Sequence, residues 1–206
     1  MNTTVTPLQN ALDSLERVAG DLEAAGGDQP LVLKGILTWS WHAVGLLAYL
    51  RLQTQRHLFD AWLQDYLNEG EPQLQIDRDA RWEERERLSY LELLDLLSEE
   101  QLPILKPEFY QGWQDRTSRC HGLRRQMVEI VGGGIGDDQR QQLLLLLAAY
   151  HRLIRLPASV ELEAEQVCQA FPALLELVDL LLDADAPGTD ALQTALDRCR
   201  KALEQS

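Results

Sequence analysis

The chain has 206 residues, of which 45% are hydrophobic and 25% are charged, and its formal net charge is −14 at pH 7. This length suits one domain, or one domain with a small helical appendage, and it supports a hydrophobic core without disulfides or metals. An acidic surface repels nucleic acid and anionic lipid at long range, which disfavours both as partners.

The cysteines and the N-terminal sequence indicate where the protein works. Three cysteines, Cys120, Cys168 and Cys199, are scattered along the chain and form no C-x-x-C pair. An odd, scattered set is typical of reduced thiols, so we expect no disulfide framework. The first ten residues, MNTTVTPLQN, carry neither a basic segment nor an apolar one, so we expect no signal peptide there. We therefore predict a cytoplasmic protein.

Residues 35–50, GILTWSWHAVGLLAYL, carry no formal charge. A membrane-spanning helix needs about 20 mostly apolar residues. This run is bounded by Lys34 and Arg51 and contains His42, and no basic cluster flanks it. We therefore expect a buried core helix and no membrane association, with the tryptophans and His42 used for packing. His42 should bond a carbonyl or a carboxylate.

Helical periodicity covers most of the chain, and the period-2 alternation of a β-strand is absent. The first helix should begin at Thr6 and Pro7, a capping residue followed by proline at the first helical position, and end at residues 26–27. The second begins near Pro30 and continues to Asn68 if it is unbroken. Further helices are predicted around Leu88–Leu97, from Pro107 to the glycines at 132–136, from Asp137 to Pro157, from Ser159 past Pro172, and from Thr189 to Leu203.

These elements predict an all-α fold, an antiparallel helical bundle of about six to seven helices, because short loops between long helices make neighbours antiparallel. Pro172 lacks an amide hydrogen and should interrupt or kink its helix. The glycine cluster at residues 132–136 indicates a flexible joint. We assign residues 1–136 to the core bundle and residues 137–206 to C-terminal helices that pack on it.

One constellation on the predicted fourth helix suggests chemistry. Arg116 falls in the middle of an apolar stripe with helical spacing, formed by Phe109, Trp113, Cys120, Leu123, Met127 and Ile130. A guanidinium there must be paired or must line a wet cleft, because an isolated buried charge is costly. His121 flanks the stripe, and Arg119, Arg124 and Arg125 make the segment locally basic.

Residues 116–121, RTSRCH, fit the pattern R-x4-H and follow a pair of long helices. In these features the chain resembles the HEPN family of helical nucleotide-binding and ribonuclease domains over residues 6–133. The resemblance implies that two chains bring their motifs together, that Arg116 holds the scissile phosphate of RNA, and that His121 assists proton transfer. Arg119, Arg124 and Arg125 would then be candidates for RNA binding.

The same residues allow a purely structural interpretation, in which Asp95 or Glu92 neutralises Arg116 and His121 is a surface residue. A second match, the R-x5-H pair Arg51 and His57, falls on a face that looks solvated. Our primary prediction is a self-associating or partner-binding module, either a homodimer or a complex with a protein partner. A HEPN-like endoribonuclease or nucleotide-binding domain is the alternative, and only this alternative involves RNA.

Two further observations bear on ligands and partners. The four histidines show neither H-x3-H nor E-x-x-H spacing, so we predict no metal and no cofactor. A third hypothesis, a small-ligand or metal-binding bundle, would need a cavity near Trp39 and His42. The leucine run Leu143–Leu147 offers more apolar surface than one core face requires, which favours a dimer interface.

Overall fold

The computed structural model describes residues 4–24, 30–54, 90–98, 128, 131–155, 164–183 and 186–205. Their helices are α1 (Pro7–Ala24), α2 (Pro30–Thr54), α5 (Tyr90–Leu97), α7 (Asp137–Arg155), α8 (Ala164–Leu181) and α9 (Thr189–Gln205). In these ranges the only extended pairing is a single parallel bridge between Ser98 and Ile135. The all-α prediction is confirmed. The total of six to seven helices stays a prediction, since it depends on ranges outside the described residues.

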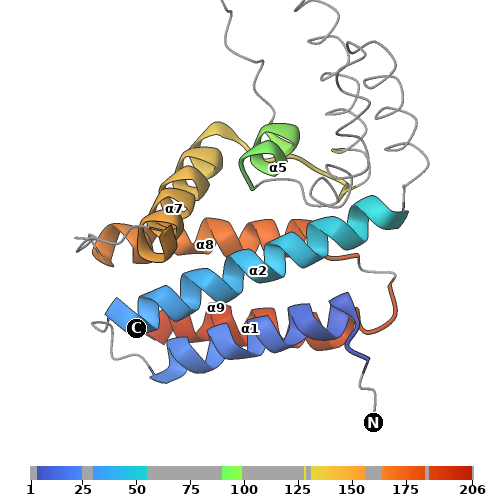
Figure 1. Cartoon of the computed structure of the whole chain (residues 1–206), viewed down its shortest axis with the longest axis horizontal. Coiled ribbons are helices and arrows are strands. Elements are labelled where there is room, and N and C mark those ends of the chain that lie inside the picture. The colour runs from blue at the N-terminus through green and yellow to red at the C-terminus, as the bar shows by residue number, and fades with distance from the viewer. Residues whose placement is uncertain are drawn as a thin grey trace, which may run out of the picture.

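Helices α1, α2, α8 and α9 lie side by side (Figure 1). The pairs α1–α2 and α8–α9 are antiparallel, whereas α2 and α8 run in the same direction. Helices α1 and α9 also run in the same direction. Gly188, just before α9, adjoins Leu8 at the start of α1, and Arg198, later in α9, pairs with Glu23 near the end of α1. The antiparallel expectation therefore fails for the two pairs of helices that are distant in sequence, because a long connection imposes no direction. The division at residue 136 stays a prediction.

Local signals explain where α1 and α9 begin. The backbone N–H of Gln9 donates to Thr6 Oγ1 at 3.2 Å, and the backbone N–H of Thr6 donates to Gln9 Oε1 at 3.0 Å. This reciprocal capping box, followed by Pro7, satisfies amides that the first turn leaves without partners. Thr189 Oγ1 lies 2.7 Å from the carbonyl oxygen of Asp183, which fixes the loop before α9. The predicted starts of both helices are confirmed.

Helix α8 continues through Pro172 from Ala164 to Leu181, so the predicted interruption is wrong, while the alternative, a kink, stays a prediction. The proline ring removes the helical partner of the Cys168 carbonyl. Both Pro172 and Cys168 are exposed, so water can bond to that carbonyl and the helix tolerates the loss. The predicted start of this helix at Ser159 lies outside the described residues.

The glycine-rich segment, residues 132–136, is anchored to the end of α5. Ile135 is fully buried, and its N–H donates to the carbonyl of Leu97 at 2.9 Å. Gly132 has a φ of 76°, in the left-handed region that favours glycine. The glycines therefore shape a tight, packed connection into α7, in contrast to the loose joint that we expected.

Helix α2 lies at the centre of the bundle, between α1 on one side and α7 and α8 on the other (Figure 1). Of residues 32–51 only Lys34 is exposed, and Trp41 is fully buried. The prediction of a covered helix for the charge-free run is confirmed. Within the described ranges, no helix combines the length and apolarity that crossing a membrane requires.

Candidate functional site

The residues predicted to carry RNA chemistry lie outside the described residues, namely Arg116, Arg119, His121, Arg124 and Arg125. The side chains of Asp95 and Glu92, the carboxylates of the structural interpretation, are not described either. Both interpretations of Arg116 and His121 therefore stay predictions. The chemistry-bearing residues that the structure does place are on α1, α2, α5, α7, α8 and α9.

Arg51, from the second motif match, holds the C-terminal end of α8. Its guanidinium donates to the carbonyl oxygens of Leu181 at 3.2 Å and Leu182 at 2.7 Å, and it pairs with Asp183 at 3.3 Å. A cation is favourable there because the last carbonyls of a helix lack partners and carry partial negative charge. The side chain is only 15% exposed, so the expectation of a solvated face is wrong. His57 lies outside the described residues.

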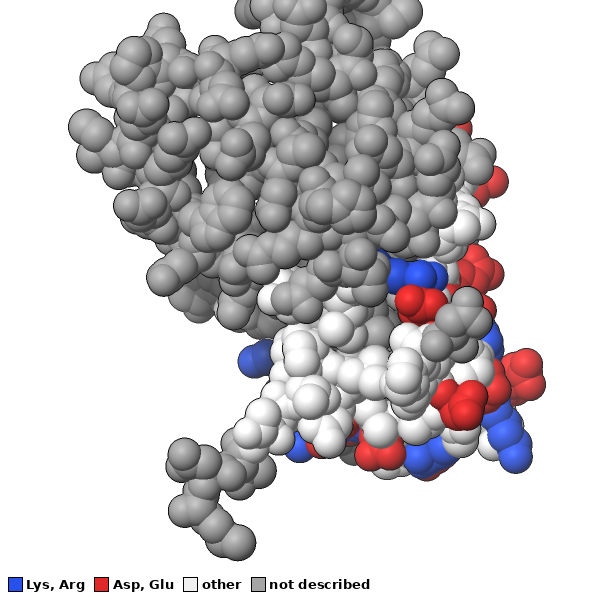
Figure 2. All heavy atoms as spheres, turned by 90° about the vertical axis from the view of Figure 1, so that its right-hand side faces the viewer, with Lys and Arg blue, Asp and Glu red and all other residues white. Residues whose placement is uncertain are grey.

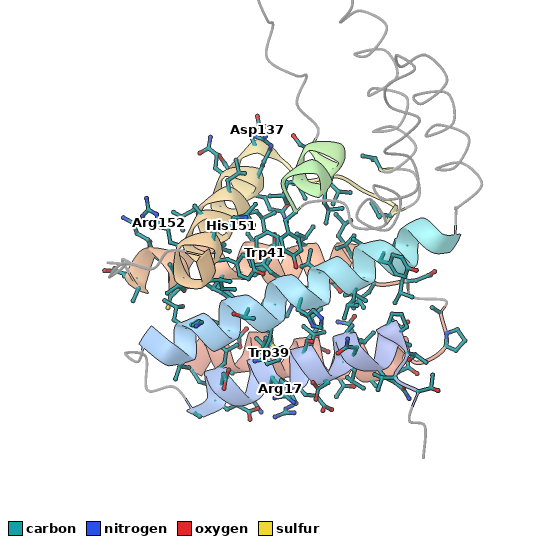
Figure 3. All side chains as sticks on the ribbon, viewed as in Figure 1. Arg17, Trp39, Trp41, Asp137, His151 and Arg152 are labelled. Carbon is teal, nitrogen blue, oxygen red and sulfur yellow. The ribbon has the colours of Figure 1, made fainter. Side chains whose placement is uncertain are left out.

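A polar seam runs along the contact between α1 and α2. We define the α1–α2 seam as Asp13, Ser14 and Arg17 on α1 with Trp39 and His42 on α2. Because the helices are antiparallel, the three-residue step from Ser14 to Arg17 matches the step from His42 back to Trp39. Ser14 thus faces His42, and Arg17 faces Trp39, across the contact, while Asp13 pairs with Arg17 on α1. Figure 3 shows Arg17 and Trp39 meeting on this side, and Trp41 on the side toward α7.

Ser14 orients His42 and is not a nucleophile. Ser14 Oγ donates to the carbonyl of Asn10 at 2.8 Å and lies 2.9 Å from His42 Nδ1. A hydroxyl has one proton, so Nδ1–H of His42 must be the donor in the second bond. A serine activated by histidine would donate in the opposite direction. Ser14 is also fully buried. The partner of Nδ1 is therefore a hydroxyl, and His42 is only partly buried; a carbonyl or carboxylate partner of the ring stays a prediction.

Arg17 and Trp39 form a stacked pair at the surface of the seam. The guanidinium carbon of Arg17 lies 4.8 Å from the centroid of the Trp39 ring, within the range of cation–π attraction. Asp13 holds the same guanidinium at 2.8 Å, and this hydrogen bond raises the pKa of Arg17 above its usual value. The His42 ring meets Trp39 edge-on at 6.2 Å. The result is a fixed, partly exposed set of rings and charge.

The opposite side of α2 carries an aromatic cluster, which we define as the buried Trp41 with the partly buried Tyr90, Tyr150 and His151. Ring centroids are 4.9 Å apart for Trp41 and Tyr90, and 5.9 Å apart for Tyr90 and Tyr150. Rings this close are in direct contact and leave no room for a cation or ligand between them. In the described part of the chain, Trp41 Nε1 and Ser40 Oγ are buried without a hydrogen-bond partner. The aromatic cluster therefore contributes to core packing, which is the role predicted for Trp41.

The described cysteines do not form a reactive site. Cys199 is buried, and its Sγ lies 3.6 Å from the carbonyl oxygen of Leu15. Burial raises the pKa of this thiol to about 12, so it stays protonated and unreactive at neutral pH. Cys168 is an exposed free thiol. Among the described residues, no group of three His, Cys, Asp or Glu side chains could hold a metal ion.

The sequence analysis named Trp39 and His42 but missed their partners on α1. Two signals point to these partners. Asp13 and Arg17 have the i, i+4 spacing of a helical ion pair. Ser14 falls among buried apolar residues of α1, including Ala11, Leu15 and Val18. A polar residue inside an apolar stripe needs a hydrogen-bond partner on the neighbouring helix, and here this partner is His42.

No family model, curated protein or solved structure matches this chain. The HEPN resemblance therefore rests on residues 116–121 and on the order of the predicted helices.

Proposed function

We propose that the chain is a non-catalytic helical module that binds a protein partner or a second copy of itself, and that the α1–α2 seam binds the protein partner. One observation supports this proposal: Trp39 is partly exposed beneath Arg17, which Asp13 holds in place. Tryptophan and arginine supply much of the binding energy at protein interfaces. Side chains that are already ordered lose little entropy when a partner arrives.

Charge favours a protein over RNA at this surface. The seam and its surroundings carry the carboxylates of Asp13, Glu16 and Asp21 against the cations of Arg17 and Lys34, in a chain with a net charge of −14. Figure 2 views one end of the bundle, where the described side chains are mostly uncharged and acidic and basic ones lie together toward the edges. RNA binding draws its affinity from cations that neutralise phosphates, and this surface supplies few of them.

Quantitative affinity capture from the cells that make the protein tests the partner-binding proposal. We expect Trp39→Ala to lose at least one protein that the wild type retains. Arg198→Ala is the matched control, because Arg198 is an exposed arginine that pairs with Glu23 away from the seam. Urea unfolding must show that both variants are folded. Identical sets of captured proteins for all three chains would contradict the proposal.

The ribonuclease alternative has a separate test. If the HEPN resemblance is functional, the purified full chain should cleave RNA, and Arg116→Ala or His121→Ala should abolish cleavage by removing the phosphate ligand or the proton-transfer group. Arg140→Ala, outside the motif, should leave cleavage intact. Absence of cleavage by the wild type, or full activity of both motif variants, would exclude this function.

A further inference from the structure

Helix α7 presents a stripe of exposed residues that is uncharged in the middle and oppositely charged at its two ends. The exposed fraction of Leu145 is 37%, whereas Leu143 and Leu146 in the same helix are fully buried; Ile154, near the end of α7, is 42% exposed. We call the following exposed residues the α7 stripe: Asp138, Gln141, Gln142, Leu145, Ala148 and Arg152. They lie within about 60° of Leu145 around the helix axis, at about 100° per residue.

The α7 stripe matches itself when its direction is reversed. Asp138 and Arg152 each lie seven residues from Leu145, which places one charge about 10 Å away on either side. A half-turn about Leu145 exchanges the two charged positions and also exchanges Gln142 with Ala148, whereas Gln141 falls on the buried Ala149. Neither Asp138 nor Arg152 makes an ion pair within the described ranges. Figure 3 shows Arg152 at one end of α7 and Asp137, the neighbour of Asp138, at the other.

The helix dipole accounts for only part of this pattern. An acidic residue at the start of a helix and a basic one at its end are both favourable, which explains the two signs. The dipole does not explain why an exposed leucine lies midway between them, or why the stripe between them carries no charge in a chain with 25% charged residues. Burial against a surface of the same pattern explains both features.

We infer that a second copy of this chain docks on the α7 stripe, with the two α7 helices antiparallel and the twofold axis at Leu145. Asp138 of each copy then pairs with Arg152 of the other, so two ion pairs flank a contact between the two Leu145 side chains. Gln142 meets the small Ala148 across the contact. Such an isologous pair is closed, because both copies use the same surface. The inference rests on the self-association part of the proposed function and uses a surface other than the seam.

A contact between single helices is small. Stable interfaces bury about 1,200–2,000 Å² in total, and one helix pair lies at or below the lower end of that range. The dimer should therefore be weak and depend on concentration. Sedimentation velocity of the full chain from about 1 µM to about 1 mM covers this regime. We expect the sedimentation coefficient to rise with concentration.

Charge reversal tests the register. In Asp138→Arg, arginine 138 faces Arg152 of the other copy twice, so the dimer dissociation constant should rise about 10-fold or more. This variant also lowers the negative net charge, so general electrostatics alone would strengthen association. Arg152→Asp should weaken the dimer as well, and the double variant should restore it. Lys201→Asp, on the exposed side of α9, is the control for net charge.

A cysteine at the axis provides a second measurement. With Cys120 and Cys168 replaced by serine, Leu145→Cys should form an intermolecular disulfide on mild oxidation, whereas Gln193→Cys on α9 should not. A dimer that persists through every charge reversal and does not cross-link at position 145 would overturn the register, while self-association through another surface would stand. A strict monomer at the highest concentration would overturn both this inference and self-association. Partner binding at the seam would then be judged by Trp39→Ala alone.

Discussion

Two tryptophans only two residues apart show how differently the two sides of α2 are built. Trp39 and Trp41 are separated by about 200° around the helix and so face opposite directions. Trp41 is fully buried in the aromatic cluster, whereas Trp39 lies partly exposed under Arg17 in the α1–α2 seam. The same residue type thus packs in the core on one side of the helix and, on the other side, lies partly exposed in the surface that we propose as a binding site.

The two sides also differ in how they treat polar groups. In the seam, Ser14 satisfies both its own hydroxyl and the ring of His42, and Asp13 satisfies Arg17. On the buried side, Trp41 Nε1 has no hydrogen-bond partner within the described residues. Hydrogen bonds therefore fix the geometry of the seam, while contact area holds the cluster together.

The largest expected difference in the free energy of unfolding is between the variants Trp41→Ala and Trp39→Ala. We expect Trp41→Ala to lower the free energy of unfolding by about 3–5 kcal/mol, because it leaves a cavity in a closed cluster. Trp39→Ala should cost about 1 kcal/mol or less, because Trp39 is only partly buried and its ring faces Arg17 at the surface. Urea unfolding at neutral pH measures both. Equal losses in the two variants would remove the distinction between the two sides of α2.

A difference in stability of intermediate size is expected between alanine substitutions at two buried serines, Ser14 and Ser40. Ser14→Ala removes the acceptor of His42 Nδ1–H and should destabilise the protein by about 1–3 kcal/mol. Ser40→Ala removes a buried hydroxyl that has no partner among the described residues, so it should be neutral or stabilising. The same unfolding experiment compares them. If Ser40→Ala proves the more harmful change, the hydrogen bonding argued for the seam is incorrect.

The smallest expected difference in stability is between alanine substitutions at two glycines of α2. A Cβ at Gly35 would meet only the carboxylate end of Asp21, at 2.6 Å, and this flexible side chain can move. A Cβ at Gly45 would press on the ring of Tyr90 at 3.3 Å, inside the packed side. Replacing a helical glycine by alanine gains up to about 1 kcal/mol when space allows. Gly35→Ala should therefore be the more stable variant, and the reverse order would contradict the assignment of the packed side.

Much of the helical framework could be predicted from local sequence. Thr6 marks the start of α1 because its hydroxyl accepts from an amide within one turn of the chain. Thr189 marks the start of α9, where its hydroxyl lies 2.7 Å from the carbonyl oxygen of Asp183 and 2.8 Å from that of Ala186. The direction of α8 relative to α2 could not be predicted, since it depends on a long connection and on distant contacts such as Arg51 with the end of α8. Local signals carry no information about such contacts.

The seam could be predicted only in part, because α2 is apolar around most of its circumference. Amphipathic periodicity identifies the outward face of a helix such as α1, but a helix without charge between Lys34 and Arg51 has no such signal. The sequence therefore assigned Trp39, Trp41 and His42 alike to packing. Their different roles depend on which neighbouring helix each one meets.

Fluorine NMR of the full chain labelled with fluorotryptophan tests the central claim most directly. The resonances of the two residues are assigned by their loss in Trp39→Phe and Trp41→Phe. We predict that the Trp39 resonance shifts between H2O and D2O and moves or broadens when a captured partner is added, while the Trp41 resonance does neither. A Trp39 resonance that changes neither between H2O and D2O nor on addition of the partner would contradict the proposal that Trp39 lies in a binding surface.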